Sequence, residues 1–192
     1  MNKIELTQGK FAIVDADDFE RVSEFKWHYN KNGKYTGYAR RRQYIGMKDG
    51  KQIQKGISMH RFIMGVEDSK VHVDHINHDT LDNRKSNLRR CTKAENGRNQ
   101  KIRKGGFSKY KGVFKSSKSR IKPFRARIMF NQKPINLGSF AAERDAAIAY
   151  NKAALHYFGE FALLNDVSEC QDWVDGLDYE VISYKRPKSN RT

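Results

Sequence analysis

The sequence has little of what secreted, disulfide-stapled or membrane-spanning proteins need. It contains only two cysteines in 192 residues, and two thiols can build neither a disulfide framework nor a four-thiolate zinc site within one chain. Its longest apolar runs, such as residues 11–14, last about four residues, whereas a membrane helix needs about 20. The amino terminus lacks the apolar core of a signal peptide. We therefore expect a cytoplasmic protein with no membrane partner.

Acidic residues are also scarce, with 22 Asp and Glu against 38 Lys and Arg, which gives a net charge of +16. Segments 1–60 and 61–104 each carry a net charge of +5, segment 105–165 carries +8 from 11 basic and 3 acidic residues, and segment 166–192 carries −2. A positive charge spread along the chain favours an extended contact with a polyanion, with nucleic acid first among the candidates. The 11 Phe, 9 Tyr and 2 Trp supply the bulky groups that a folded core requires.

Residues 1–60 alternate β-forming runs with turn signals. The Asn-Gly pair at 32–33 and the Asp-Gly pair at 49–50 are strong hairpin signals. Strand-like runs lie at 11–14, 26–29, 35–40, 44–47 and 52–58. This pattern predicts a small antiparallel sheet, followed by a short helix over 59–64.

The rest of the chain predicts two further modules. Residues 61–104 contain a strand, VHVDH, a polar loop, a second strand, NLRRCT, and a helix over 93–100. After the basic linker IRKGGFSK come three strand-like runs and a helix from about residue 141 to 158, with its alanines on one face. We therefore expect an α+β protein divided as follows: a β-rich segment 1–60, a strand-strand-helix motif 61–104, a three-stranded sheet with one helix 105–165, and a tail 166–192.

Residues 74–96 carry groups suited to phosphodiester hydrolysis. The imidazole of His75 titrates near neutrality, so it can act as a base. Asp74 and the amide oxygen of Asn96 are hard oxygen ligands suited to Mg²⁺ or Mn²⁺. A regular strand would point Asp74 and His75 to opposite faces, so the strand must end or twist at this pair for both to serve one site.

The stretch VDHINHDTLDNRKSNLRRCTKAENGRNQ resembles the HNH endonuclease motif of phage and intron-encoded homing endonucleases, whose fold is the ββα-metal finger. The resemblance implies that His75 is the general base and that Asp74 and Asn96 hold the catalytic metal. It also implies that Asn87 fixes the loop and orients the imidazole. The family often has His where this chain has Asn96, which still offers an oxygen ligand.

Residues 107–165 are similar to the AP2 DNA-binding domain, through Tyr110, Gly112, Val113, Leu137, Gly138, Phe140, the Ala-rich helix, Gly159 and Asn165. That family lays its sheet in the major groove of double-stranded DNA. The alternation of Ala126 and Ile128 with Arg125 and Arg127 predicts that the two arginines lie on the outward face. We expect DNA contacts from Lys111, Lys115, Arg125 and Arg127. Phe114, Met129 and Asn136 differ from the usual residues of the family, so its base preference does not transfer.

Residues 6–29, together with GYARR and MHRFIM, resemble the region that precedes the HNH motif in phage HNH proteins carrying an AP2 module. Arg40, Arg41 and Arg42 are further candidates for phosphate contacts. Their alternative role is that of a solvated strand end.

These features predict a DNA endonuclease of the HNH class, of the homing type, in a phage or bacterial host cell. With one active site, a monomer would nick DNA. The main alternative is a non-catalytic DNA-binding regulator that uses the AP2-like module. Four residues together argue against this alternative, since a pure binder has no need of a base beside a metal ligand. They are Asp74, His75, Asn87 and Asn96.

Overall fold

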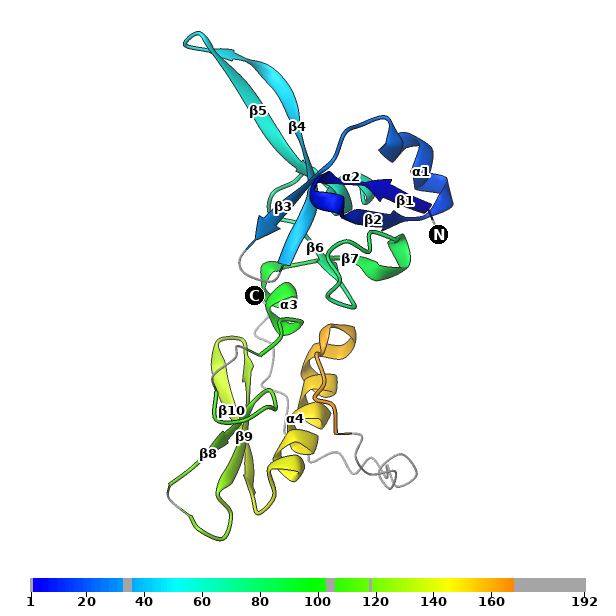
Figure 1. The fold of residues 1–192 in the computed structure, drawn as a ribbon. Coiled ribbons are helices and arrows are strands. Elements are labelled where there is room, and N and C mark those ends of the chain that lie inside the picture. The colour runs from blue at the N-terminus through cyan, green and yellow to red at the C-terminus, as the bar shows by residue number, and fades with distance from the viewer. Residues whose placement is uncertain (1, 33–35, 103–105, 118, 168–192) are drawn as a thin grey trace. The chain divides into compact units, whose positions relative to one another are not determined.

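The protein was analysed as a computed structural model that describes residues 2–32, 36–102, 106–117 and 119–167. Two compact units divide the chain. The first comprises Met1–Arg103 together with Ala154–Leu163, and the second comprises Lys104–Ala153 together with the residues from Leu164 on. Both are built from small antiparallel sheets and short helices (Figure 1). The prediction of an α+β protein is confirmed at this level.

In the described residues, the first unit holds three small antiparallel sheets, the helices α1, α2 and α3, and the end of a fourth helix, α4 (Glu143–Phe158). Up to α3, their order along the chain is β1 (Asn2–Glu5), β2 (Phe11–Val14), α1 (Ala16–Ser23), β3 (His28–Asn32), β4 (Thr36–Lys48), β5 (Lys51–Ser58), α2 (Met59–Ile63), β6 (His72–His75), β7 (Leu88–Cys91) and α3 (Lys93–Arg98). The sheets are β1-β2, β3-β4-β5 and β6-β7. No helix in the described residues is long and apolar enough to span a membrane.

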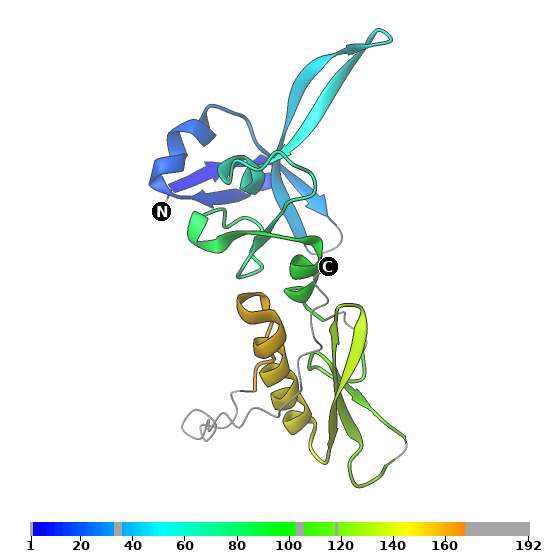
Figure 2. The same cartoon turned by 180° about the vertical axis from the view of Figure 1, so that it is seen from behind.

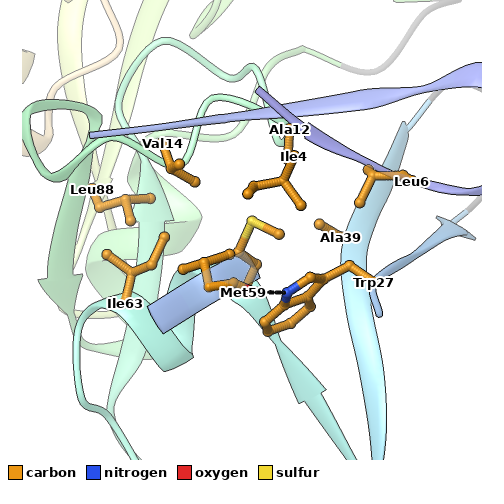
Figure 3. Close-up of a cluster of buried hydrophobic side chains, with 10 residues drawn as sticks. Ile4, Leu6, Ala12, Val14, Trp27, Ala39, Met59, Ile63 and Leu88 are labelled. Carbon is orange, nitrogen blue, oxygen red and sulfur yellow. Dashed lines mark hydrogen bonds between the residues drawn. The ribbon is translucent and has the colours of Figure 1, made fainter. Parts of the chain in front are cut away.

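One hydrophobic core joins these elements. Figure 3 shows Val14 of β2, Met59 and Ile63 of α2 and Leu88 of β7 meeting in this cluster, with Trp27 beside Met59. The indole Nε1 of Trp27 donates a hydrogen bond to the Val22 carbonyl over 2.9 Å, which satisfies the polar end of a buried aromatic. Because β7 contributes to the same core, the predicted segments 1–60 and 61–104 fold as one unit.

Strands β4 and β5 form a hairpin that extends away from the rest of the first unit, in both Figure 1 and Figure 2. Asp49 and Gly50 at its tip have φ values of +52° and +72°, as the turn predicted from the Asp-Gly pair requires. Residues 36–40 and 44–47 of the two predicted runs lie in a single strand, β4, and residue 35 of the first run is outside the described residues. The register of β4 shifts between Tyr44 and Gly46, so the chain passes through a bulge without leaving the sheet.

Helix α1 was not predicted from the sequence. Asp15 precedes it, and Asp17 and Asp18 lie in its first turn, where carboxylates are favoured by the helix dipole. Only Asp18 and Val22 of this helix are buried. At eight residues, the helix is also shorter than the window of about 11 residues or more over which hydrophobic periodicity is recognised.

The second unit is a three-stranded sheet with a helix. It contains β8 (Val113–Lys115), β9 (Phe124–Phe130), β10 (Lys133–Phe140) and the start of α4 (Glu143–Phe158), with the strand order β10-β9-β8. Ala126 of β9 and Ala146 and Ala147 of α4 are fully buried in its core, where small side chains allow close packing of helix and sheet. Of the predicted tail 166–192 only the first two residues are described, and Val167 is buried in this same core.

Candidate active site

Asp74 and His75 are the last two residues of β6, and both are buried, with 9% and 5% of their surface exposed. In the β6-β7 pair, Asp74 lies opposite Arg89 and His75 opposite Leu88. Strand β6 ends at this pair, as their joint use in one site requires. Asp74 and His75 nevertheless have different sets of neighbours.

Asn87 fixes the loop that follows His75. Its side-chain Oδ1 accepts a hydrogen bond from the Asn77 backbone N–H at 3.0 Å, and its Nδ2 donates to the Asp82 carbonyl at 2.8 Å. The Asp82 carboxylate in turn accepts hydrogen bonds from Asn77 Nδ2 and from two guanidinium nitrogens of Arg84. Asn87 therefore acts on the loop backbone, and no hydrogen bond joins it to the imidazole among the described residues.

The partner of the His75 ring is Asn83, in the loop between β6 and β7. His75 Nε2 lies 3.5 Å from Asn83 Oδ1, and Asn83 Nδ2 donates to the Leu81 carbonyl at 3.1 Å. That second bond fixes which way the amide of Asn83 faces. Because an amide oxygen only accepts, a hydrogen bond at this contact requires the tautomer of neutral His75 that carries its proton on Nε2, and in that tautomer Nδ1 keeps its electron pair.

Two further aromatic rings lie beside His75. The His60 ring is 5.0 Å away between centroids, at 76°, and the Tyr38 ring is 6.1 Å away. Burial, followed by the positive charge of nearby groups, lowers the pKa of His60 to about 3. Burial also lowers the pKa of His75, while the Asn83 contact and the negative charge of Asp74 oppose that shift. Both imidazoles are therefore neutral at pH 7.

Among the described residues, hydrogen-bond donors reach only one of the two carboxylate oxygens of Asp74. Its Oδ2 accepts hydrogen bonds from Arg89 Nη2 at 2.9 Å, Arg89 Nε at 3.2 Å and Asn99 Nδ2 at 2.8 Å. Asn99 also donates to the His75 carbonyl at 3.3 Å. Among the described residues, no donor reaches Oδ1, so this oxygen is left for a partner from outside the protein.

Asn96 lies on α3 and is half-buried. This helix is anchored by a capping box, in which the Thr92 side chain accepts from the Glu95 backbone and the Glu95 carboxylate accepts from the Thr92 backbone. Asn99, three residues on, is the amide that the structure brings onto Asp74. None of the described residues forms a hydrogen bond with the Asn96 side chain.

In the second unit, the candidate DNA-binding residues on β9 share one surface. Arg127 is exposed and Arg125 half-buried, and their guanidinium carbons lie 5.1 and 5.9 Å from the centre of the Phe114 ring. Together with Pro134 and Asn136 they line an open depression. Their alternation with buried Ala126 and Ile128 follows the predicted pattern.

The two predicted lysines differ in environment. Lys115 is exposed on β8, with its ammonium 5.2 Å from the Phe107 ring. Lys111 is half-buried, and burial lowers its pKa to about 8. The charge of Lys111 is therefore the less available of the two.

The three consecutive arginines at the base of the β4-β5 hairpin are likewise not equivalent. Arg40 and Arg42 are exposed, but Arg41 is half-buried, with its guanidinium carbon 3.9 Å from the centre of the Phe25 ring. The same group lies within 6 Å of the Phe62 and Trp27 rings. Arg41 thus packs on the aromatic edge of the core, whereas its two neighbours project into solvent.

Comparison with known proteins identifies the class to which this site belongs. Residues 61–98 match the HNH endonuclease family. The chain is also 33% identical over 165 residues to a protein of Acanthamoeba polyphaga mimivirus described as an uncharacterized HNH endonuclease, with 83% of this chain and 77% of that protein aligned. No solved structure matches the chain.

The chain therefore belongs to the HNH endonuclease family, a family of nucleases that act on DNA. Asp74, His75, Asn87 and Asn96 all lie within the matched residues 61–98. Asn99 lies one residue after the end of the matched segment, and Tyr38 and His60 lie before its start.

Proposed function

We propose that this protein is a metal-dependent endonuclease that cuts double-stranded DNA, with His75 as its general base. One observation carries the proposal: among the described residues, no hydrogen-bond donor reaches Nδ1 of the buried imidazole of His75 or Oδ1 of the preceding carboxylate, Asp74. A base and a metal ligand are the two groups that hydrolysis of a phosphodiester requires from the protein. The family of the chain supports the same reaction class.

The proton step follows from the contacts of His75. Nδ1 takes a proton from the attacking water, while Nε2 keeps its proton and donates to Asn83 Oδ1. The imidazolium that results is stabilised by the negative charges of Asp74, Asp79 and Asp82. Attack on phosphorus in line with the departing 3′ oxygen leaves a 5′ phosphate and a 3′ hydroxyl.

Asp74 and Asn96 are the residues that we propose to hold Mg²⁺ or Mn²⁺. Oδ1 of Asp74 and the amide oxygen of Asn96, which no donor reaches in the part of the chain that the structure describes, fit an ion that prefers hard oxygen ligands. No group of three or more His, Cys, Asp or Glu side chains that could hold a metal occurs in the described residues. Such a sparse site suits an ion that completes its shell with water and phosphate oxygens. When bound, the ion supplies positive charge to the phosphate and to the leaving oxygen.

We propose that the second unit is an AP2-like module that docks the enzyme on its target. The segment 105–165 has a net charge of +8, and β9 presents Arg125 and Arg127 on the sheet face opposite the buried alanines. The β4-β5 hairpin adds a second basic surface, with Arg40 and Arg42 exposed. Two-stranded ribbons and sheets of this size fit the major groove of DNA.

A monomer of this kind would cut one strand for each binding event, so we propose a nicking enzyme of the homing type. The test is incubation of supercoiled plasmid carrying candidate target sites with the protein and either Mg²⁺ or EDTA. Conversion to open circles with Mg²⁺ alone supports a nickase. Linear product would show that the enzyme makes double-strand breaks, and the proposal of a nicking enzyme would be wrong. Binding without cleavage in both conditions would refute the endonuclease and favour the alternative, a non-catalytic DNA-binding regulator.

A further inference from the structure

The nuclease unit includes residues that follow the second module in sequence. Ala154–Leu163 belongs to the same unit as β6, β7 and α3, although residues 104–153 lie between them in the chain. Gly159, with φ at +54°, ends α4 and starts the 3-10 turn Gly159–Phe161. A left-handed residue at this position lets the chain reverse direction directly after the helix. Phe158–Phe161 is called the 158–161 turn below.

The 158–161 turn touches two elements of the candidate active site. On β7, Arg89 donates from Nη1 to the Glu160 carbonyl over 2.5 Å, and its guanidinium carbon lies 4.3 Å from the centre of the Phe161 ring. On α3, the guanidinium carbon of Arg98 lies 4.7 Å from the Phe158 ring. The turn therefore braces both the strand opposite Asp74 and the helix that carries Asn96.

Arg89 transmits this contact to Asp74. The guanidinium is planar and its donors are fixed in one fork. Nε and Nη2 point to Asp74 Oδ2, and Nη1 points to the Glu160 carbonyl. The Phe161 ring lies beside the guanidinium, and the Glu160 carbonyl accepts a hydrogen bond from Nη1, which does not contact Asp74. The side chains of Arg89 and Asp74 are only 11% and 10% exposed, so most of this ion pair is shielded from water.

We propose that the 158–161 turn is a positioning element of the nuclease site, which acts through Arg89 to hold Asp74 with its Oδ1 free. This inference rests on the proposed function, since it assigns Asp74 the role of metal ligand. Outer groups that orient a metal ligand typically change metal affinity or activity by about 10- to 100-fold. The inference also implies that a chain ending before residue 154 lacks part of its nuclease, so that removing the second module would impair cutting as well as DNA docking.

The test compares three variants of the full chain. Phe161→Ala removes the ring beneath Arg89, Phe161→Tyr keeps it, and Leu155→Ala removes a side chain of the same segment that is 49% exposed. For each variant, thermal melting reports the fold, and DNA affinity in EDTA reports docking. Calorimetry with Mn²⁺ reports metal binding, and nicking at varied Mn²⁺ reports both the rate and the metal concentration at half saturation.

For Phe161→Ala we expect weaker Mn²⁺ binding and nicking about tenfold slower at limiting Mn²⁺, with melting and DNA affinity within error of the parent. Phe161→Tyr should match the parent in Mn²⁺ affinity and in nicking rate at limiting Mn²⁺. Leu155→Ala should match the parent in melting, DNA affinity, Mn²⁺ affinity and nicking rate. The inference is overturned if Phe161→Ala binds Mn²⁺ as the parent does, or if Leu155→Ala loses as much as Phe161→Ala. A parent that binds Mn²⁺ more tightly than Phe161→Ala yet never cuts DNA would support the positioning role and refute the proposed function.

Discussion

The surroundings of His75 and the outer face of the β8-β9-β10 sheet use polar side chains in opposite ways. Asp74, His75, Asn83 and Asn87 are each less than 10% exposed, and each is held by named partners. On the outer face of the sheet, Arg127 and Lys115 are exposed and rest against single aromatic rings. The first arrangement fixes atoms in place, and the second leaves cationic groups free to adjust.

This difference in burial predicts that one region determines the rate of DNA cleavage and the other the affinity for DNA. Buried polar groups are costly to desolvate and are tolerated only when they are hydrogen-bonded, so the network around His75 determines the position of each reactive atom. Exposed arginines and lysines cost the fold little and contribute to DNA binding mainly through phosphate charge. Substitutions in the first region should therefore change the rate of cutting, and those in the second should change affinity and its dependence on salt.

The largest expected effect comes from His75→Ala. Loss of a general base typically slows a reaction by about 10²- to 10⁴-fold, whereas a neutral imidazole contributes little to DNA binding. Nicking rate and DNA affinity, measured on the same preparation, should therefore diverge. His28→Ala, which removes an exposed histidine of β3, is the control. Near-normal nicking by His75→Ala would remove the general base from the proposed mechanism.

The next largest effect is expected for Asp74→Asn, which keeps an oxygen at the Oδ1 position and removes the negative charge. We expect nicking to fall by at least about tenfold at low Mg²⁺, with part of the rate regained at high Mn²⁺. Calorimetry should show weaker Mn²⁺ binding. Asp17→Asn, at an exposed carboxylate of α1, is the control for loss of one negative charge. If Asp74→Asn bound Mn²⁺ as tightly as the parent, Asp74 would not be a ligand.

Much of this architecture could be predicted from local patterns. The strands around Val73 and Leu88, the helix after Thr92 and the Asp49-Gly50 turn each depend on residues close together in sequence, so their signals are visible without the fold. Asp74 and His75 could be selected as candidates because a carboxylate next to an imidazole is visible in the sequence, and their catalytic roles stay a prediction. Helix α1 was not predicted because its eight residues are too few for a periodic apolar pattern to be recognised.

The partners of these groups could not be predicted, because they come from distant parts of the chain. His60 reaches His75 from α2, and Glu160 reaches Arg89 from 71 residues away. Asn99 and Asn96 are chemically identical in the sequence, and only the arrangement of α3 against β6 brings Asn99 onto Asp74. Arg41 likewise looks equivalent to Arg40 and Arg42 until the positions of Phe25 and Phe62 are known.

A more moderate effect is expected from the double substitution of Arg125 and Arg127 by Ala. Each lost phosphate contact should lower the slope of log affinity against log salt by about 0.9, so the slope should fall by up to about 1.8. The rate of nicking at saturating protein should stay unchanged, because neither side chain touches the His75 network. Lys152→Ala, on α4, is the control for loss of charge in this unit. An unchanged slope would exclude this sheet face from docking.

A smaller effect concerns pH. Burial lowers the pKa of His75 below its ordinary value of 6.5, so the neutral base persists to lower pH than for a solvated imidazole. In a pH profile of kcat/KM, the acid limb should therefore have its midpoint below 6.5. The negative charge of Asp79 raises the pKa of His75, so Asp79→Asn should move that midpoint lower still. An upward shift in this variant would contradict the assignment of the limb to His75.

The smallest effect is expected within the Arg40 to Arg42 run, where both kinds of polar group stand side by side. Arg41→Ala removes a guanidinium stacked on Phe25, so it should lower the free energy of unfolding by about 0.5–2 kcal/mol, with little change in the salt slope. Arg42→Ala should leave stability unchanged and lower the slope by about 0.9 if this residue contacts phosphate. Chemical denaturation and salt-dependent binding measure the two outcomes separately. If both variants lost only affinity, Arg41 would have to leave its aromatic contacts when DNA binds, and the division between fixed and adjustable polar groups would not hold at the base of the hairpin.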